Sequence, residues 1–118
     1  MSDNEERANP FDGAQLQNGH FARADMTGTH FDGVNLAGAR FFAVLSKAQF
    51  NDTNLAEAQF HDVNLGNADF NDVNLSAAVF QNINFSDASI SNANLTGMRI
   101  NGVLVSDLFE AYEKSQKA

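Results

Sequence analysis

The chain has 118 residues and a formal net charge of −8, so its length suits one domain that buries a core. The negative charge argues against nucleic acid or an anionic membrane as a direct ligand, because both would be repelled. With no cysteine, the chain offers neither a disulfide nor a thiol nucleophile.

Residues 1–9 are polar and predict a short flexible tail, and Pro10 marks the start of the ordered body. The tail has no apolar stretch, so no signal peptide is expected. No later apolar run is long enough to span a membrane. We therefore expect a cytoplasmic protein that does not insert into a membrane.

From Phe11 to Val105 a large apolar residue recurs at almost every fifth position, and a mostly small residue lies two positions before each one. Two inward-facing residues two apart require extended backbone, because alternate residues of a strand share a face. The intervening residues are rich in Asn, Asp, Gly, Ser and Thr, which favour tight turns. The pattern predicts a solenoid with a short extended piece and a turn in each repeat.

The repeat resembles the pentapeptide-repeat family, whose consensus is A-(D/N)-L-x-x. The stretches V-N-L-A-G at 34–38 and A-N-L-T-G at 93–97 are close to it, and the resemblance covers residues 9–105. It implies an all-β fold, a right-handed four-sided β-helix with four pentapeptides per coil and about five coils, over residues 10–105. The C-terminal segment, 106–118, lies outside the repeat.

Four repeats per coil place residues about 20 apart in one column. The columns expected on two opposite sides are Phe11, Phe31, Phe50, Phe70 and Ile90, and Phe21, Phe41, Phe60, Phe80 and Ile100. Rings at coil spacing can stack, which adds about 0.5–1.5 kcal/mol per pair beyond burial. We also expect an asparagine ladder, with amides hydrogen-bonded from coil to coil, formed by Asn35, Asn54, Asn74 and Asn94.

The spacing falls to four between Phe41 and Leu45, which leaves Phe42 and Val44 at positions that elsewhere point outward. The simpler interpretation is a tolerated deletion whose extra apolar residues fold back over one corner. The alternative is an exposed apolar site for a partner.

Residues 107–117 predict a helix, with Asp107 as the N-cap and Glu110 completing a capping box. A helix of about three turns is marginal alone, so its apolar residues, Leu108, Phe109 and Tyr112, must dock onto something. Two roles remain open, a lid over the last coil or a homodimer contact. In family members with a similar layout, the C-terminal end joins two β-helices tail to tail.

Catalysis would need ionisable groups brought within hydrogen-bonding reach. The three histidines form no His–carboxylate–nucleophile set and show no metal-ligand spacing. The glycines are scattered turn residues rather than a phosphate-binding loop. We therefore predict a protein that is not an enzyme and that has no cofactor and no metal site.

Acidic residues gather between Lys47 and Arg99, where no Lys or Arg occurs. The predicted partner-binding edge consists of Asp12, Asp32, Asp52, Asp69 and Asp72. Solvated turns are the simpler interpretation and need no function, because carboxylates one coil apart repel by only about 1 kcal/mol at the dielectric of water. A metal-binding or catalytic site on this edge is a third interpretation.

We predict a non-enzymatic protein-binding module or scaffold that presents an acidic β-helix surface to a protein partner, possibly a basic one. The family resemblance implies an alternative. Its best-understood members resemble double-stranded DNA in diameter and charge, and they bind DNA gyrase or a related topoisomerase in place of DNA. Such a DNA mimic would protect the enzyme from quinolone-type inhibitors.

Overall fold

The computed structural model describes residues 13–117. Its contacts divide the chain into two units, with the boundary between Phe31 and Asp32. In the first unit, residues 13–31 form turns without a strand. One turn is closed by the amide of Gly19, which donates to the carbonyl of Leu16 at 3.1 Å, and another by the amide of Thr29, which donates to the carbonyl of Met26 at 3.1 Å.

The large apolar residues of the first unit are not buried, contrary to the expectation of an inward-facing column. Their exposed fractions are 48% for Leu16, 61% for Phe21, 39% for Met26 and 44% for Phe31. Within this unit the backbone forms turns but no strand ladder, so no two extended segments bring these side chains together. Phe11, which shares a predicted column with Phe31, lies outside the described residues.

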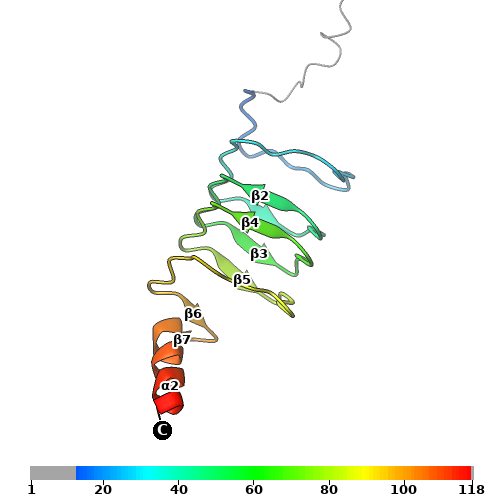
Figure 1. The fold of residues 1–118 in the computed structure, drawn as a ribbon. Coiled ribbons are helices and arrows are strands. Elements are labelled where there is room, and N and C mark those ends of the chain that lie inside the picture. Colours follow the sequence, from blue (N-terminus) through cyan, green and yellow to red (C-terminus); the bar gives the residue numbers. More distant parts are fainter. Residues whose placement is uncertain (1–12, 118) are drawn as a thin grey trace, which may run out of the picture. The chain divides into compact units, whose positions relative to one another are not determined.

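The second unit contains parallel strands of two or three residues each: β1 (Arg40–Phe41), β2 (Gln49–Asn51), β3 (Gln59–His61), β4 (Asp69–Asn71) and β5 (Val79–Gln81). They form two sheets, with strand orders β1-β3-β5 and β2-β4, and β2 lies beside β4 in Figure 1. Phe50 is opposite Phe70, and Phe60 is opposite Phe80. Strand partners 20 residues apart correspond to four five-residue repeats, as predicted.

The break in the repeat shortens one connection. Phe41 pairs with Phe60, and Asn35 bridges Asn54, so these partners are 19 residues apart rather than 20. One residue fewer between two coils shifts every position before the break by one relative to every position after it. This offset decides which acidic residues come together.

In most repeats of this unit a left-handed turn residue lies two positions after the large apolar residue; none follows Phe41, and Asn101 comes directly after Ile100. The non-glycine residues with positive φ in this unit are Lys47, Asp52, Glu57, Asp62, Asn67, Asp72, Ala77, Asn82, Asp87, Asn92 and Asn101. Asn, Asp and Gly tolerate this conformation better than other residues do. The polar composition of the repeat therefore has a direct backbone cause.

The asparagines before the leucine column do not form the expected amide-to-amide ladder. Asn54 Oδ1 instead accepts a hydrogen bond at 2.9 Å from the amide of Ala56, and Asn74 Oδ1 accepts one at 2.9 Å from the amide of Ser76. Each side chain is thus used within its own turn. The coil-to-coil bonds come from the backbone, where the Leu55 amide donates to the Asn74 carbonyl at 2.8 Å.

The core of the second unit is centred on residues 50–63, where Leu55 and Ala58 are fully buried and Phe60 is 1% exposed. Phe60 stacks on Phe41 at 5.1 Å and on Phe80 at 5.0 Å between ring centroids. The expected stacking of aromatic rings is therefore present in this coil and its two neighbours. Burial is deepest here because a paired coil lies on each side.

The last part of the body departs from the expected columns. Strand β6 (Arg99–Ile100) pairs antiparallel with β7 (Val103–Leu104), instead of pairing in parallel with β5. The turn between them, Asn101–Gly102, has φ values of +49° and +82°, and Asn-Gly is a strong hairpin signal. A local hairpin has therefore taken the hydrogen bonds that a further coil would need.

As a result, the predicted positions of Ile90 and Ile100 at the ends of the two aromatic columns are wrong, since they are 64% and 49% exposed. A groove of about 2280 Å³ lies among residues 65–101. Phe85 is 54% exposed and lines it.

Helix α2 (Val105–Lys117) follows β7 directly and reaches the C-terminal end of the described chain (Figure 1). It begins two residues before the predicted start, so Asp107 lies in its first turn rather than at the N-cap. Val105 is 7% exposed, and its amide donates to the carbonyl of Met98 at 3.0 Å, which ties the helix to the preceding repeat. Among residues 13–117, no helix has the length and apolar character needed to cross a membrane.

Candidate protein-binding surface

The acidic side chains of the second unit are positioned mainly by the left-handed turns. Asp52 and Asp72 have φ values of +50° and +54°, and both are exposed. The amide of Asp52 donates to the carbonyl of Asn71 on the next coil at 3.1 Å. The backbone at Asp52 is thus held by the ladder while its carboxylate faces solvent.

The predicted acidic edge is assembled only in part. Asp52 and Asp72 occupy the same turn position on neighbouring coils, and Asp69 lies on β4, where it pairs with Gln49. Asp32 is exposed but directly follows Phe31, whereas Asp52 is two residues after Phe50. The shift at the register break therefore separates Asp32 from that turn position. Asp12 lies outside the described residues.

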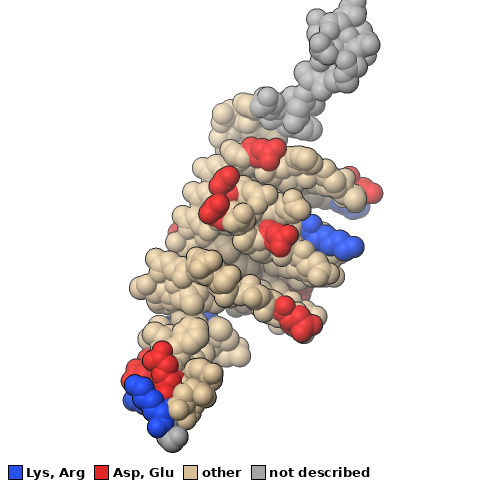
Figure 2. All heavy atoms as spheres, in the orientation of Figure 1, with Lys and Arg blue, Asp and Glu red and all other residues tan. Residues whose placement is uncertain are grey.

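The acidic surface is discontinuous where the structure describes it. On the face of the second unit drawn in Figure 2, red side chains over the strands stand apart with uncharged residues between them, and red and blue lie together on α2. In the other turn columns, Asp62 is followed one coil later by Asn82 and Glu57 by Ala77. Asp52 and Asp72 are thus consecutive acidic turns, whereas the acidic turns at Asp62 and Glu57 are each followed one coil later by a neutral one.

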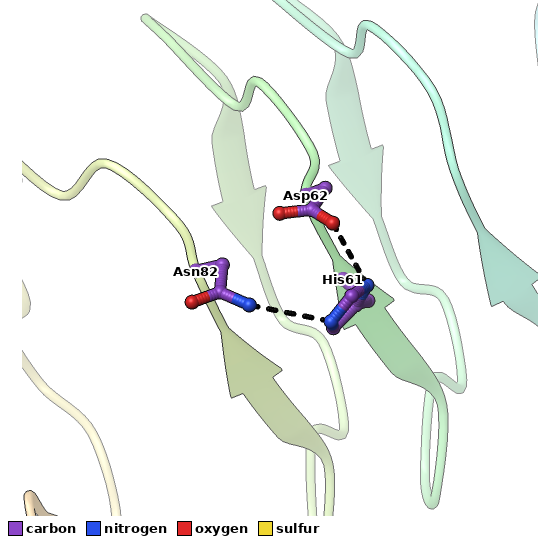
Figure 3. A network of polar contacts seen from close by, with 3 residues as sticks. All are labelled: His61, Asp62 and Asn82. Carbon is purple, nitrogen blue, oxygen red and sulfur yellow. Dashed lines mark hydrogen bonds and ion pairs between the residues drawn. The ribbon is translucent and has the colours of Figure 1, made fainter.

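A small polar network lies at the end of β3. His61 Nδ1 is 3.1 Å from Asp62 Oδ2, and His61 Nε2 is 3.3 Å from Asn82 Nδ2 (Figure 3). The amide nitrogen of Asn82 has only hydrogens to offer, so Nε2 accepts and the proton of a neutral ring is on Nδ1, facing Asp62. This network links two coils through side chains.

The register break exposes two apolar side chains near that network. Phe42 is 73% exposed and Val44 is 76% exposed, so the interpretation that they fold back over the corner is wrong. The Phe42 ring meets the His61 ring at 5.8 Å with an interplanar angle of 69°. The Asn64 amide donates to the Ala43 carbonyl at 3.3 Å, as the Asn74 amide does to the Thr53 carbonyl at 3.1 Å, so Ala43 is equivalent to Thr53 and the residue missing from this repeat is the left-handed one. Phe42 and Val44 therefore stand at the outward-facing positions that Asn51 and Asn54 occupy in the repeat that begins at Phe50.

The apolar face of α2 is also open to solvent. Leu108, Phe109 and Tyr112 are 45%, 53% and 62% exposed. These values contradict a lid in which this face covers the last coil. The polar side of the helix carries an ion pair between Lys114 and Glu110 at 3.1 Å.

The repeat pattern is recognised by comparison with known families. The profile described as pentapeptide repeats matches the chain in eight copies, over residues 11–42, 42–72 and 68–107. The chain belongs to the pentapeptide-repeat family. No curated protein and no solved structure matches it significantly.

In the first unit of this pentapeptide-repeat protein, one carboxylate is tuned by its own turn. Asp25 Oδ1 accepts hydrogen bonds from the Thr27 hydroxyl at 2.6 Å and from the Thr27 amide at 3.0 Å. These bonds stabilise the charged form and hold the pKa of Asp25 below its ordinary value, the hydroxyl contributing most.

Sequence reasoning missed the network of His61, Asp62 and Asn82, although a signal for it exists. The 20-residue register that places Phe80 on Phe60 also places Asn82 on Asp62. Charge identifies only the acidic residues, whereas Asn82, at the turn equivalent to Asp62, is a neutral amide. For pentapeptide repeats, the polar turn columns can be read with the same register as the core columns.

Proposed function

We propose that this protein is a non-enzymatic module that binds a protein partner through the exposed turns of a right-handed, four-sided β-helix of about five coils. The observation that carries the proposal is the division of roles within each repeat. Large apolar residues such as Leu55 are buried, while the turn residue two positions later is exposed. The turn residues that carry a negative charge are Asp52, Glu57, Asp62, Asp72 and Asp87.

The charge distribution favours a partner with a basic surface. The net charge is −8, and the segment between Lys47 and Arg99 contains no Lys or Arg. Exposed carboxylates at fixed turns lose little entropy on binding, because the backbone that holds them is already ordered. They attract a basic protein at long range and less strongly as salt rises.

The test is capture followed by a direct binding measurement. The immobilised chain is used to capture a partner from a lysate of its host, and the purified partner is then titrated by calorimetry at 50 and 300 mM NaCl. We expect saturable binding that weakens at least several-fold at the higher salt and in the double variant Asp52→Asn/Asp72→Asn. Lys47→Gln, at an equivalent turn, serves as the matched control and should not weaken binding. A partner that binds equally well at both salt concentrations, and equally well to the parent and to Asp52→Asn/Asp72→Asn, would contradict the acidic-surface proposal.

A narrower candidate is mimicry of DNA toward gyrase or a related topoisomerase. The observation that favours it is the repetition of a carboxylate at one turn position on neighbouring coils, at Asp52 and Asp72. The assay is DNA supercoiling by gyrase, with and without a quinolone, at increasing protein concentration. Protection from the quinolone supports mimicry, and unchanged supercoiling at micromolar protein rules it out.

We also propose that two copies associate through α2. The helix is 13 residues long and has one buried residue, Val105, while Leu108, Phe109 and Tyr112 are about half exposed or more. Burying this face contributes a transfer free energy of about 25 cal/mol per Å² of apolar area, which must exceed the entropy lost when two copies associate.

Light scattering coupled to size exclusion tests the dimer. The parent should have twice the 12.8 kDa mass of one chain, and Leu108→Ser/Phe109→Ser should reduce the mass to that of one chain. Glu113→Gln, also exposed on α2, is the control and should leave the dimer intact. A parent with the mass of a single chain at micromolar concentration would contradict this proposal.

A further inference from the structure

Phe42 and Val44 are the two most exposed large apolar side chains among residues 13–117. They lie at the single place in the second unit where the repeat is one residue short. An isolated exposed apolar residue is ordinary, but two at positions 42 and 44, separated by one residue, form a small contact surface. We name the set Phe42, Val44, His61, Asp62 and Asn82 the Phe42 corner.

A shallow depression of about 390 Å³ continues from this corner. It is lined by Asp62, Val63, Asn64, Asn82 and Asn84. Val44 bridges Asn64 in parallel, so the exposed valine lies on the coil next to one wall of the depression. An apolar contact surface and a polar hollow therefore adjoin.

The depression offers hydrogen-bond acceptors. His61 engages Asp62 Oδ2 and Asn82 Nδ2, which leaves Asp62 Oδ1 and Asn82 Oδ1 directed away from the ring (Figure 3). The Asp62 side chain is 64% exposed, so its carboxylate is accessible. No Lys or Arg is among the residues that line the depression. Arg40, two residues before Phe42, pairs with Gln59 on β3 and is not one of them.

We propose that the Phe42 corner binds one arginine side chain of a protein partner. The guanidinium donates to Asp62 Oδ1 and Asn82 Oδ1 and packs against the Phe42 ring, while apolar atoms next to that arginine cover Val44. Arginine suits the site better than lysine, because its planar fork of five donors reaches several acceptors at once and stacks on aromatic rings. This inference rests on the proposed protein-binding function and names where, and by what chemistry, it occurs.

The test uses two blocked amino acids that differ in charge but hardly in shape, N-acetyl-arginine amide and N-acetyl-citrulline amide. Each is titrated into the isotope-labelled full chain, and the backbone and side-chain amide signals are followed by NMR. We expect saturable shifts from the arginine probe, with a dissociation constant on the order of millimolar, at residues 42–44, 62–64 and 82–84. The citrulline probe should give shifts at least about fivefold smaller, since it lacks the positive charge.

Variants separate the corner from general attraction to acidic residues. Asp62→Asn and Phe42→Ala should each weaken the arginine probe several-fold, while Asp107→Asn, the same substitution at an exposed residue of α2, should leave it unchanged. All three side chains are exposed, so the fold should persist, and unchanged amide signals across residues 50–60 verify this. Equal shifts at Asp52 and at Asp62, or equal binding by Asp62→Asn, would overturn the proposal.

The outcome is independent of the search for a natural partner. Specific arginine binding with no basic protein captured supports the corner and counts against the proposed function. A captured partner whose affinity is unaffected by Asp62→Asn and Phe42→Ala supports the proposed function and overturns the corner as its binding site.

Discussion

Replacing Phe60 by alanine should remove a large part of the stability of the second unit. The side chain is 1% exposed and stacks between Phe41 and Phe80 with interplanar angles of 8° on both sides. Truncating a buried phenylalanine typically costs about 3–5 kcal/mol, and the filled column on both sides leaves little room for collapse. A domain of this size is stable by about 5–15 kcal/mol in total.

A second substitution isolates the stacking contribution. Phe60→Leu keeps most of the apolar volume and loses two stacked contacts, each worth about 0.5–1.5 kcal/mol, so we expect a loss of about 1–3 kcal/mol. Phe70→Ala provides a comparison within the other column. Phe70 is 36% exposed and stacks only on Phe50, at 4.7 Å, so its loss should cost about 2 kcal/mol.

The free energy of unfolding is measured by urea titration followed by circular dichroism. The expected order of destabilisation is Phe60→Ala, then Phe70→Ala and Phe60→Leu at similar values. If Phe60→Ala costs no more than Phe70→Ala, the column around Phe60 does not carry the stability that its burial implies. A change in the slope of unfolding free energy against urea concentration would show that a different number of repeats unfolds together in the variant, as can happen in repeat proteins.

Three further predictions concern the turns. Asn74→Ala removes the acceptor of the Ser76 amide and should lower the free energy of unfolding by about 1 kcal/mol, measured by urea titration; an unchanged midpoint would contradict a role for the side chain. Asp52→Val should lower the free energy of unfolding by about 1–2 kcal/mol, because a β-branched side chain is strained at a φ of +50°. Asp52→Gly should leave that free energy nearly unchanged, and both are compared by thermal unfolding. Equal effects of the two substitutions would show that the turn relaxes. Thr27→Val should raise the pKa of Asp25 in an NMR titration of its carboxyl carbon, because the hydroxyl bond is the main cause of the lowered value. An unchanged pKa of Asp25 in the variant would refute the assignment of the hydroxyl bond as the main cause. In the parent, the lowered folded-state pKa of Asp25 stabilises the fold at pH values above the unfolded pKa, and this contribution is lost as pH falls through the folded-state pKa.

Core positions in the second unit could be predicted from the sequence because they depend on local geometry. The five-residue period identifies Phe50, Leu55 and Phe60 as inward-facing, and all three are buried. The turn that produces this period needs only a residue that tolerates a positive φ, and Asn, Asp and Gly supply it. The 20-residue pairing of β2 with β4 and of β3 with β5 equals four such repeats.

The candidate surface was only partly predictable, because it depends on offsets and competition between distant segments. A 20-residue spacing links Asp32 to Asp52 in the sequence, but Asn35 pairs with Asn54, and the lost residue moves Asp32 out of that turn. The asparagine side-chain oxygens accept hydrogen bonds within their own turns, since the backbone amide that donates lies two residues later and is reached without ordering a second coil.

The C-terminal part and the Phe42 corner were decided by tertiary structure. The hairpin at Asn101–Gly102 needs hydrogen bonds only between near neighbours, whereas a further coil needs partners 20 residues away, and the loop-closure cost favours the local pairing. Sequence alone placed Phe42 at an irregular position but left its direction open. Its position faces outward in the other repeats, as at Asn51, and the structure shows that the Phe42 ring stays there, 73% exposed, beside a network that joins two coils. The sequence by itself therefore determined the repeat and its central core, while the tertiary structure decided which side chains that repeat presents to a partner.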